Sequence, residues 1–128
     1  MLASYPERFF EDWNVGDSFV TADANVSREE CLEFARRYDP QPFHLDDDAA
    51  DSSVFRGLAA SGWLTSAVTM RLVVESGVMR GSGILGTGVD ELRWLAPVYP
   101  GDNLHVEAKS WNLRPIPAAR VLAACVCV

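Results

Sequence analysis

The sequence has few cysteines, and their placement excludes two kinds of site. There are three cysteines in 128 residues, an odd number, and none stands at the spacing of a metal-ligand set. Cys125 and Cys127 are two residues apart, so in a strand both point to the same face and would not readily form a disulfide. We interpret the cysteines as free thiols that pack as small apolar side chains, which is typical of proteins in a reducing compartment. We therefore expect a cytoplasmic protein.

Basic residues and long apolar runs are also scarce. The chain has 11 Lys and Arg against 18 Asp and Glu, a net charge of −7, and Arg36–Arg37 is the only adjacent basic pair. Nucleic-acid binding needs clustered cations, so we expect no nucleic-acid partner. No run approaches the roughly 18 apolar residues that a membrane helix needs, and the N-terminus lacks the basic start and apolar stretch of a targeting signal. We expect no association with membranes.

What is present fits one globular domain. A hydrophobic content of 48% and the length of 128 residues predict a single domain over residues 1–128. Residues Ser18 to Val26 predict a first strand. Ser27 and Glu30 have the spacing of a capping box, which predicts a helix from there to about Tyr38. This helix would present one apolar face, made of Cys31, Phe34, Ala35 and Tyr38.

Prolines end this helix and stiffen the loop that follows. In Asp39-Pro40-Gln41-Pro42 each proline removes a backbone donor and favours extended geometry in the residue before it. Asp39 therefore lies just past the helix end. Asp46-Asp47-Asp48 then predicts the start of a short helix through Ala49 and Ala50, because the helix dipole favours negative charge there.

The rest of the chain predicts one buried helix followed by strands. Residues Leu58 to Glu75 have apolar side chains on most sides of a helical wheel, which is typical of a buried helix. Its first turn, Ala59-Ala60-Ser61-Gly62, consists of small residues that allow a backbone or a ligand to approach closely. The strands and turns that we expect after it are a strand over Ile84–Leu95, a turn at Pro100-Gly101-Asp102, a half-buried strand over Leu104–Trp111, breaks at Pro115 and Pro117, and a buried strand over Val121–Val128. This layout predicts an α+β fold.

Asp39 and His44 are the candidate catalytic pair. They lie five residues apart on a loop that Pro40 and Pro42 stiffen, so both side chains could face one cavity. Histidine titrates near neutral pH and a partly desolvated aspartate can be tuned toward it, so the two could activate a water and transfer a proton. The spacing alone also fits a structural role, in which Asp39 caps the preceding turn and His44 is a satisfied buried histidine.

A family resemblance favours the catalytic interpretation. The stretch from Phe34 to Asp46, with Asp39, Pro42, His44, Leu45 and Asp46 in order, and the later Gly57-Leu58-Ala59-Ala60-Ser61-Gly62-Trp63, closely resemble the signature of MaoC-like dehydratases. The segment Leu95-Ala96-Pro97-Val98-Tyr99-Pro100-Gly101-Asp102 is similar to a hairpin turn of the same family. The resemblance covers roughly residues 9 to 112.

The resemblance implies a fold, a reaction and an assembly. It implies a hotdog fold, in which an antiparallel sheet wraps a long central helix, and pairing of two protomers. It also implies an (R)-specific hydro-lyase that adds water to a 2-enoyl thioester or removes it from the (R)-3-hydroxyacyl form. The substrate would be carried by coenzyme A or an acyl carrier protein. We expect no cofactor, and no metal at Asp39, His44 and Asp46, because one His and two Asp lack a clean zinc pattern. Asp39 and His44 match the catalytic pair, and Gly62 matches the glycine whose backbone N–H binds the thioester carbonyl, as an unpaired N–H in a first helical turn can.

The chain departs from the family pattern at three places. Gln41 stands where the family commonly has Asn, and Ser61 stands where a His often precedes the glycine. We expect both to line the substrate site with Gly62, and Trp63 to form a wall of the acyl pocket. The family usually continues past the position of Val128 by another strand, so we interpret the C-terminus as shortened, or as atypical after about Pro115.

Two other functions fit the same fold. A hotdog thioesterase would release a free thiol from acyl-CoA without reaction at a double bond. A non-catalytic acyl-CoA-binding module would bind the thioester without turnover.

Overall fold

The computed structural model describes residues 5–81, 83, 85–86, 88–116 and 119–127, with side chains described as far as Ser110 and at Leu113. The chain divides into two compact units. The first unit consists of Met1–Asp23, Thr69–Thr87 and His105–Val128, and the second of Ala24–Val68 and Gly88–Leu104. Helix α3 (Gly62–Glu75) has residues in both units. The prediction of one domain over residues 1–128 stays a prediction.

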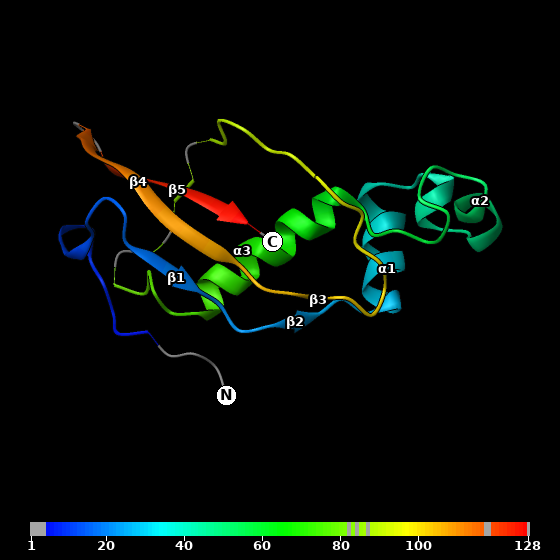
Figure 1. Cartoon of the computed structure of the whole chain (residues 1–128), viewed down its shortest axis with the longest axis horizontal. Coiled ribbons are helices and arrows are strands. Elements are labelled where there is room, and N and C mark those ends of the chain that lie inside the picture. Colours follow the sequence, from blue (N-terminus) through cyan, green and yellow to red (C-terminus); the bar gives the residue numbers. More distant parts are fainter. Residues whose placement is uncertain (1–4, 82, 84, 87, 117–118, 128) are drawn as a thin grey trace. The chain divides into compact units, whose positions relative to one another are not determined.

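The first unit contains a three-stranded antiparallel sheet in the order β1-β4-β5 (Figure 1). Strand β1 (Ser18–Val20) pairs with the start of β4 (Glu107–Ile116), and β4 pairs along its length with β5 (Ala119–Cys127). A register shift interrupts the β4–β5 pairing between Ser110 and Asn112. A short 3-10 helix, η1 (Phe10–Asp12), precedes β1.

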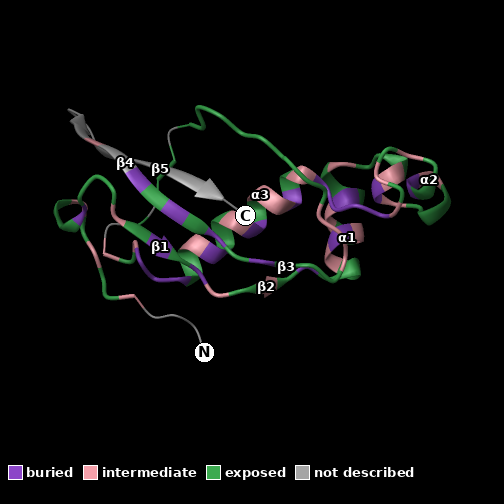
Figure 2. Cartoon of the chain, viewed as in Figure 1, coloured by how far each residue is buried: buried purple, intermediate pink, exposed green. Residues whose placement is uncertain are grey.

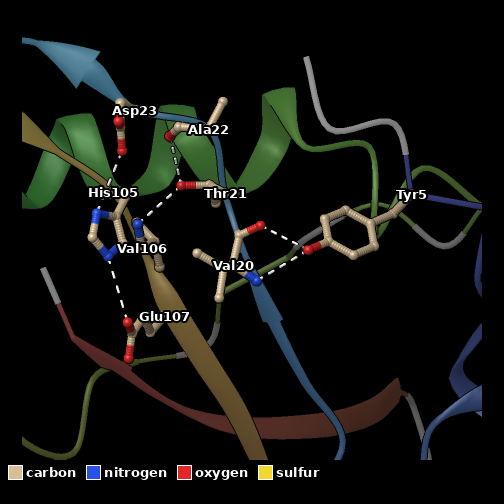
Figure 3. A network of polar contacts seen from close by, with 8 residues as sticks. All are labelled: Tyr5, Val20, Thr21, Ala22, Asp23, His105, Val106 and Glu107. Atoms are coloured by element: carbon tan, nitrogen blue, oxygen red, sulfur yellow. Dashed lines mark hydrogen bonds and ion pairs between the residues drawn. The ribbon is translucent and has the colours of Figure 1, made fainter. Parts of the chain in front are cut away.

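Side chains replace the main chain in the hydrogen bonding around β1. Tyr5 Oη donates to the carbonyl of Val20 at 2.7 Å and accepts from its N–H at 3.1 Å. The N–H of Thr21 donates to the carbonyl of Val106 at 2.9 Å, and the N–H of Val106 donates to Thr21 Oγ1 at 2.9 Å (Figure 3). Because a hydroxyl here takes the place of a carbonyl, the regular ladder stops at Thr21.

Burial alternates along residues 104–110, which end β3 and begin β4, as the sequence predicts. Leu104, Val106, Ala108 and Ser110 are buried, and the residues between them are exposed (Figure 2). His105 is one of these exposed residues. Its Nδ1 lies 3.4 Å from Asp23 and its Nε2 lies 3.5 Å from Glu107 (Figure 3). The other buried side chains of the first unit are those of Trp13, Phe19, Thr21, Leu72, Ser76 and Val78.

The second unit contains the helices that carry the candidate site. They are α1 (Arg28–Tyr38), the 3-10 helix η2 (Pro42–His44), α2 (Asp47–Asp51) and the first half of α3. A two-stranded antiparallel sheet joins β2 (Ala24–Asn25) to β3 (Asn103–Leu104). Both α1 and α2 contact η2. The buried residues of this unit are Val26, Cys31, Ala35, His44, Ala50, Leu58, Ala59, Ala60, Ser61, Leu64, Val68 and Leu104.

Capping side chains define the first two helices at the predicted positions. Ser27 Oγ accepts from the N–H of Glu30 at 3.1 Å at the start of α1, and Asp46 Oδ1 accepts from the N–H of Ala49 at 2.9 Å at the start of α2. Each bond satisfies a donor that the helix leaves unpaired. On α1, Cys31 and Ala35 are buried as predicted, whereas Tyr38 is exposed.

Four predicted elements differ in the structure. The strand expected over Ser18–Val26 is two short strands, β1 and β2, because Thr21 interrupts the ladder. The described residues within Ile84–Leu95 form no strand; they pair with nothing that could hold a strand in register. Strand β4 continues through Pro115, which a strand tolerates where it lacks a second neighbour, since β1 pairs only with Glu107, Ala108 and Lys109.

The helix expected from Leu58 begins instead at Gly62. The N–H of Ala60 donates to the carbonyl of Val98 at 2.8 Å, and the carbonyl of Ala59 accepts from His44. These bonds hold the segment before Gly62 outside the helix. Pro117 and Val128 lie outside the described residues. None of the helices in the described part of the chain combines the length and the apolar character needed to cross a membrane.

Candidate active site

The end of α1 and the loop after it place Asp39. Its N–H donates to the carbonyl of Ala35 at 3.0 Å, and its own carbonyl accepts from the N–H of Gln41 at 2.8 Å. Both of these bonds use backbone groups of Asp39, and its carboxylate contacts other side chains instead. Two bonds from Arg28 to Asp47, at 3.1 and 2.7 Å, connect the starts of α1 and α2 on either side of this loop.

The Asp39 carboxylate contacts three side chains. Its Oδ2 accepts from Ser61 Oγ at 2.6 Å and lies 3.3 Å from His44 Nε2. Its Oδ1 accepts from Gln41 Nε2 at 2.6 Å. Only 15% of the Asp39 side chain is exposed. The structure thus brings Asp39, His44, Ser61 and Gln41 into one hydrogen-bonded cluster.

The surroundings of Asp39 favour its ionised form. Burial by itself raises the pKa of the carboxyl, but the hydrogen bonds from Ser61 and Gln41 and the charge of His44 together hold that pKa below its ordinary value. Hydrogen bonds to a carboxylate stabilise the charged form because the donors approach the negative oxygens. The cluster therefore holds a carboxylate at neutral pH.

His44 is buried, with 5% of the residue exposed, and its partners fix its tautomer. Nδ1 lies 2.7 Å from the carbonyl oxygen of Ala59. Because a carbonyl oxygen only accepts, Nδ1 carries a proton. Nε2, the nitrogen that faces Asp39, is then an acceptor in the neutral ring and a donor in the cation. The rings of Phe43 and Phe55 pack against the imidazole ring of His44, with distances of 4.7 and 6.0 Å between ring centroids.

The start of α3 supplies a free backbone donor beside this cluster. Ser61 Oγ, which donates to Asp39, also accepts from the N–H of Trp63 at 3.2 Å, and the carbonyl of Ser61 accepts from the N–H groups of Leu64 and Thr65. Ser61 is therefore the N-cap of the helix. Among the described residues none accepts a hydrogen bond from the N–H of Gly62. This donor, at the positive end of the helix dipole, can bind an oxygen that gains negative charge.

Two tryptophans stand at this helix start. Trp63 is exposed, and its ring meets the ring of Trp94 edge to face at 5.2 Å. The sequence predicts Trp63 as a wall of the acyl pocket but does not predict its contact with Trp94. The two residues lie about thirty positions apart in the chain, and no local sequence pattern indicates a contact over that separation.

Within the ranges described, no group of three or more His, Cys, Asp or Glu side chains could hold a metal ion. The donors that meet here are one carboxylate, one imidazole, one hydroxyl, one amide side chain and one backbone N–H. Such a set can exchange protons and stabilise an anion.

Comparison with known proteins shows the family of the chain. The profile of the MaoC like domain matches residues 12–121, which include every residue of the cluster. The chain belongs to the MaoC-like domain family. The MaoC-like dehydratase from Rhodospirillum rubrum is 45% identical, with a TM-score of 0.86 over 93% of this chain and 83% of that one. The uncharacterised protein YdeM of Bacillus subtilis is 34% identical over 105 residues, 82% of this chain and 74% of YdeM.

Similarity to a named hydratase is more distant. R-hydratase PhaJ1 from Pseudomonas aeruginosa is 28% identical, with a TM-score of 0.64 over 83% of this chain and 66% of that one. These relationships confirm the α+β hotdog fold of this MaoC-like chain and place it in a hydratase and dehydratase family.

Proposed function

We propose that the chain catalyses (R)-specific hydration of 2-enoyl thioesters, or the reverse dehydration of (R)-3-hydroxyacyl thioesters. The observation that carries the proposal is the carboxylate of Asp39 facing His44 Nε2 at 3.3 Å, while Ser61 connects the same oxygen to the start of α3. The similarity to a Pseudomonas aeruginosa R-hydratase supports the reaction and its stereochemistry.

The two side chains and the free amide cover the needs of the reaction. The oxygen of water bonds to C3 of the enoyl group, and the electron pair of the double bond moves toward the thioester, whose oxygen becomes negative. The N–H of Gly62 would stabilise that oxygen, an interaction whose loss typically costs ~10²–10³ in rate. One proton of the water passes to the Asp39–His44 pair, and one proton is delivered from the pair to C2. The sum is one water added.

The tautomer of His44 defines where protons move. Because Ala59 holds the proton of Nδ1, the exchangeable site of the ring is Nε2, next to the carboxylate. Asp39 would stabilise the imidazolium form when Nε2 takes a proton. The two groups lie 3.3 Å apart, so we assign acid and base roles to the pair and to neither group alone.

The test is the rate of hydration of a short enoyl-CoA, followed by the loss of absorbance of the conjugated thioester. We expect Asp39→Asn and His44→Ala each to lower kcat/KM by at least ~10²–10⁴, the range typical of acid–base groups. His105→Ala is the matched control, because it removes the second of the chain's two histidines, which is exposed and bound to other carboxylates. Unchanged rates in both site variants would end the assignment.

Two further measurements, of free thiol and of acyl-CoA binding, separate the two rival functions. Release of free thiol from acyl-CoA without any change at the double bond would identify a thioesterase. Tight binding of acyl-CoA with no turnover of any thioester would identify a binding module.

Carrier, assembly and location belong to the same proposal. We propose coenzyme A or an acyl carrier protein as the carrier, and a cytoplasmic location. We also propose that two copies pair, and the exposed apolar residues of segment 88–95 support this: Val89, Leu92 and Leu95 are 74%, 44% and 90% exposed. Apolar side chains gathered in one exposed segment are typical of an interaction surface.

A further inference from the structure

We infer that Trp94 forms the wall of the acyl site beside Gly62 and thereby limits the length of the acyl group. The inference rests on the proposed function, because it assumes that a thioester carbonyl binds at the Gly62 N–H. It assigns a role to a residue that lies in a segment without regular secondary structure, residues 88–97.

The first observation is the contact between the indole and Gly62. A Cβ atom at position 62 would lie 2.5 Å from Trp94 Cδ2 and 2.6 Å from Cε2. The ring therefore fills the space that any other side chain would need. The φ angle of Gly62 lies outside the left-handed region, so the backbone conformation does not require glycine. Since glycine weakens a helix relative to alanine, the ring of Trp94 is what requires it.

The second observation is a chain of hydrogen bonds that orients the indole. Trp94 Nε1 donates to Ser66 Oγ at 3.3 Å, and Ser66 Oγ donates to the carbonyl of Gly62 at 3.2 Å. Trp94 is thus connected to Gly62 twice, by ring packing and through Ser66. Neither connection uses the N–H of Gly62, which is left for a ligand.

The third observation is that the ring is partly exposed. Trp94 is 47% exposed, and Trp63, which packs on it edge to face, is 58% exposed. The contacts with Gly62, Ser66 and Trp63 hold the indole in place, and about half of it stays exposed. The exposed half can contact a ligand without a rearrangement of the core. Tryptophan is suited to this because its rigid apolar face offers a large contact area.

These contacts predict a consequence for substrate choice. An acyl group whose carbonyl binds the Gly62 N–H would extend past the indole face, so Trp94 would stop long chains and accept short ones. Apolar walls discriminate modestly, roughly 10–200-fold for a single methylene. Removing the ring should therefore change the ratio between long and short substrates, whereas a general structural defect would lower both alike.

The experiment compares the wild type with Trp94→Ala, Trp94→Phe and Val15→Ala. Val15→Ala is the control, because it removes apolar bulk from a residue that is 64% exposed and lies outside both the site and segment 88–95. Two ratios are measured for each protein. One is kcat/KM for the eight-carbon over the four-carbon 2-enoyl-CoA, and the other is the calorimetric Kd for butanoyl-CoA over octanoyl-CoA.

We expect Trp94→Ala to raise both ratios by about tenfold or more, Trp94→Phe to give intermediate values, and Val15→Ala to leave both unchanged. If the wild type hydrates enoyl-CoA but Trp94→Ala leaves the ratios unchanged, the wall is wrong and the reaction stands. If the binding ratio changes but no protein shows turnover, the wall stands and the reaction is wrong. A wild type that binds neither saturated thioester overturns both.

Discussion

At the scale of single residues, the site depends on how Asp39 is held. Its carboxylate has three side-chain partners, and two of them are close donors, Ser61 and Gln41. The prolines of the loop made the approach of Asp39 to His44 predictable from the sequence. The part of Ser61 was not predictable, because its hydroxyl reaches Asp39 across 22 positions of the chain.

Replacing Ser61 with alanine should change the pH dependence of activity. The Ser61 hydroxyl is one of the groups that lower the pKa of Asp39 against the effect of burial, so Ser61→Ala should raise that pKa. The acid limb of the kcat/KM profile then moves to higher pH, since less Asp39 is ionised at a given acidic pH. A profile from pH 4 to pH 9 measures this. An acid limb that does not move would contradict the role of Ser61.

The same change has a defined sign for stability. A carboxyl whose pKa is lowered by folding stabilises the folded state above its unfolded pKa of about 3.9, and this stabilisation is lost as the pH falls through the folded value. Ser61→Ala makes the pKa of Asp39 less depressed and removes one hydrogen-bond donor from its carboxylate. We expect the free energy of unfolding near neutral pH to fall by about 1–3 kcal/mol. Ser76→Ala, at another buried serine, is a control that should leave the acid limb in place.

At the scale of secondary-structure elements, the start of α3 is the informative case. The apolar pattern predicted the helix correctly but not its first residue. The apolar periodicity carries no information about the hydrogen bonds that the backbone groups of Ala59 and Ala60 make with His44 and Val98. Caps close in sequence were predicted well, as at Ser27 and Asp46. Strand boundaries that depend on distant partners were not, as in the segment from Ile84 to Leu95.

The contact between Gly62 and Trp94 predicts that Gly62→Ala affects stability differently in the wild type and in the Trp94→Ala variant. In the wild type, Gly62→Ala should lower the free energy of unfolding by about 1–3 kcal/mol, because the new methyl group overlaps the Trp94 ring. In the Trp94→Ala background the same substitution should be neutral or stabilising by up to about 1 kcal/mol, since alanine favours helix. Urea unfolding of the four proteins gives the coupling. Equal effects in both backgrounds would show that the ring does not constrain position 62.

At the scale of the whole molecule, the hotdog fold was predicted through the motif around Asp39 and Gly62, and the family match confirms it. Composition and periodicity alone reached only the α+β class. Pairing of two copies, which the resemblance implies, stays a prediction, and the exposed apolar residues of segment 88–95 are the surface that we propose for it. Val89, 74% exposed, is one of them.

A charge within this segment should separate the copies. We expect the wild type to elute as a dimer in size-exclusion chromatography with light scattering, and Val89→Glu to shift it toward monomer, because a charge is costly to bury in an interface. Val54→Glu is the control, since Val54 is 91% exposed and lies outside the segment. A monomeric wild type at all concentrations, or equal disruption by both variants, would contradict the proposed surface.

The phenol of Tyr5 has a protective consequence for the sheet. Strand β1 ends the described sheet order, and a terminal strand with open amides and carbonyls is a template for unwanted pairing with another chain. By engaging both backbone groups of Val20, this one side chain leaves that residue with no open amide or carbonyl for another chain. Resistance to aggregation at this border thus depends on an aromatic hydroxyl from outside the sheet, where many proteins rely on a lysine or a proline.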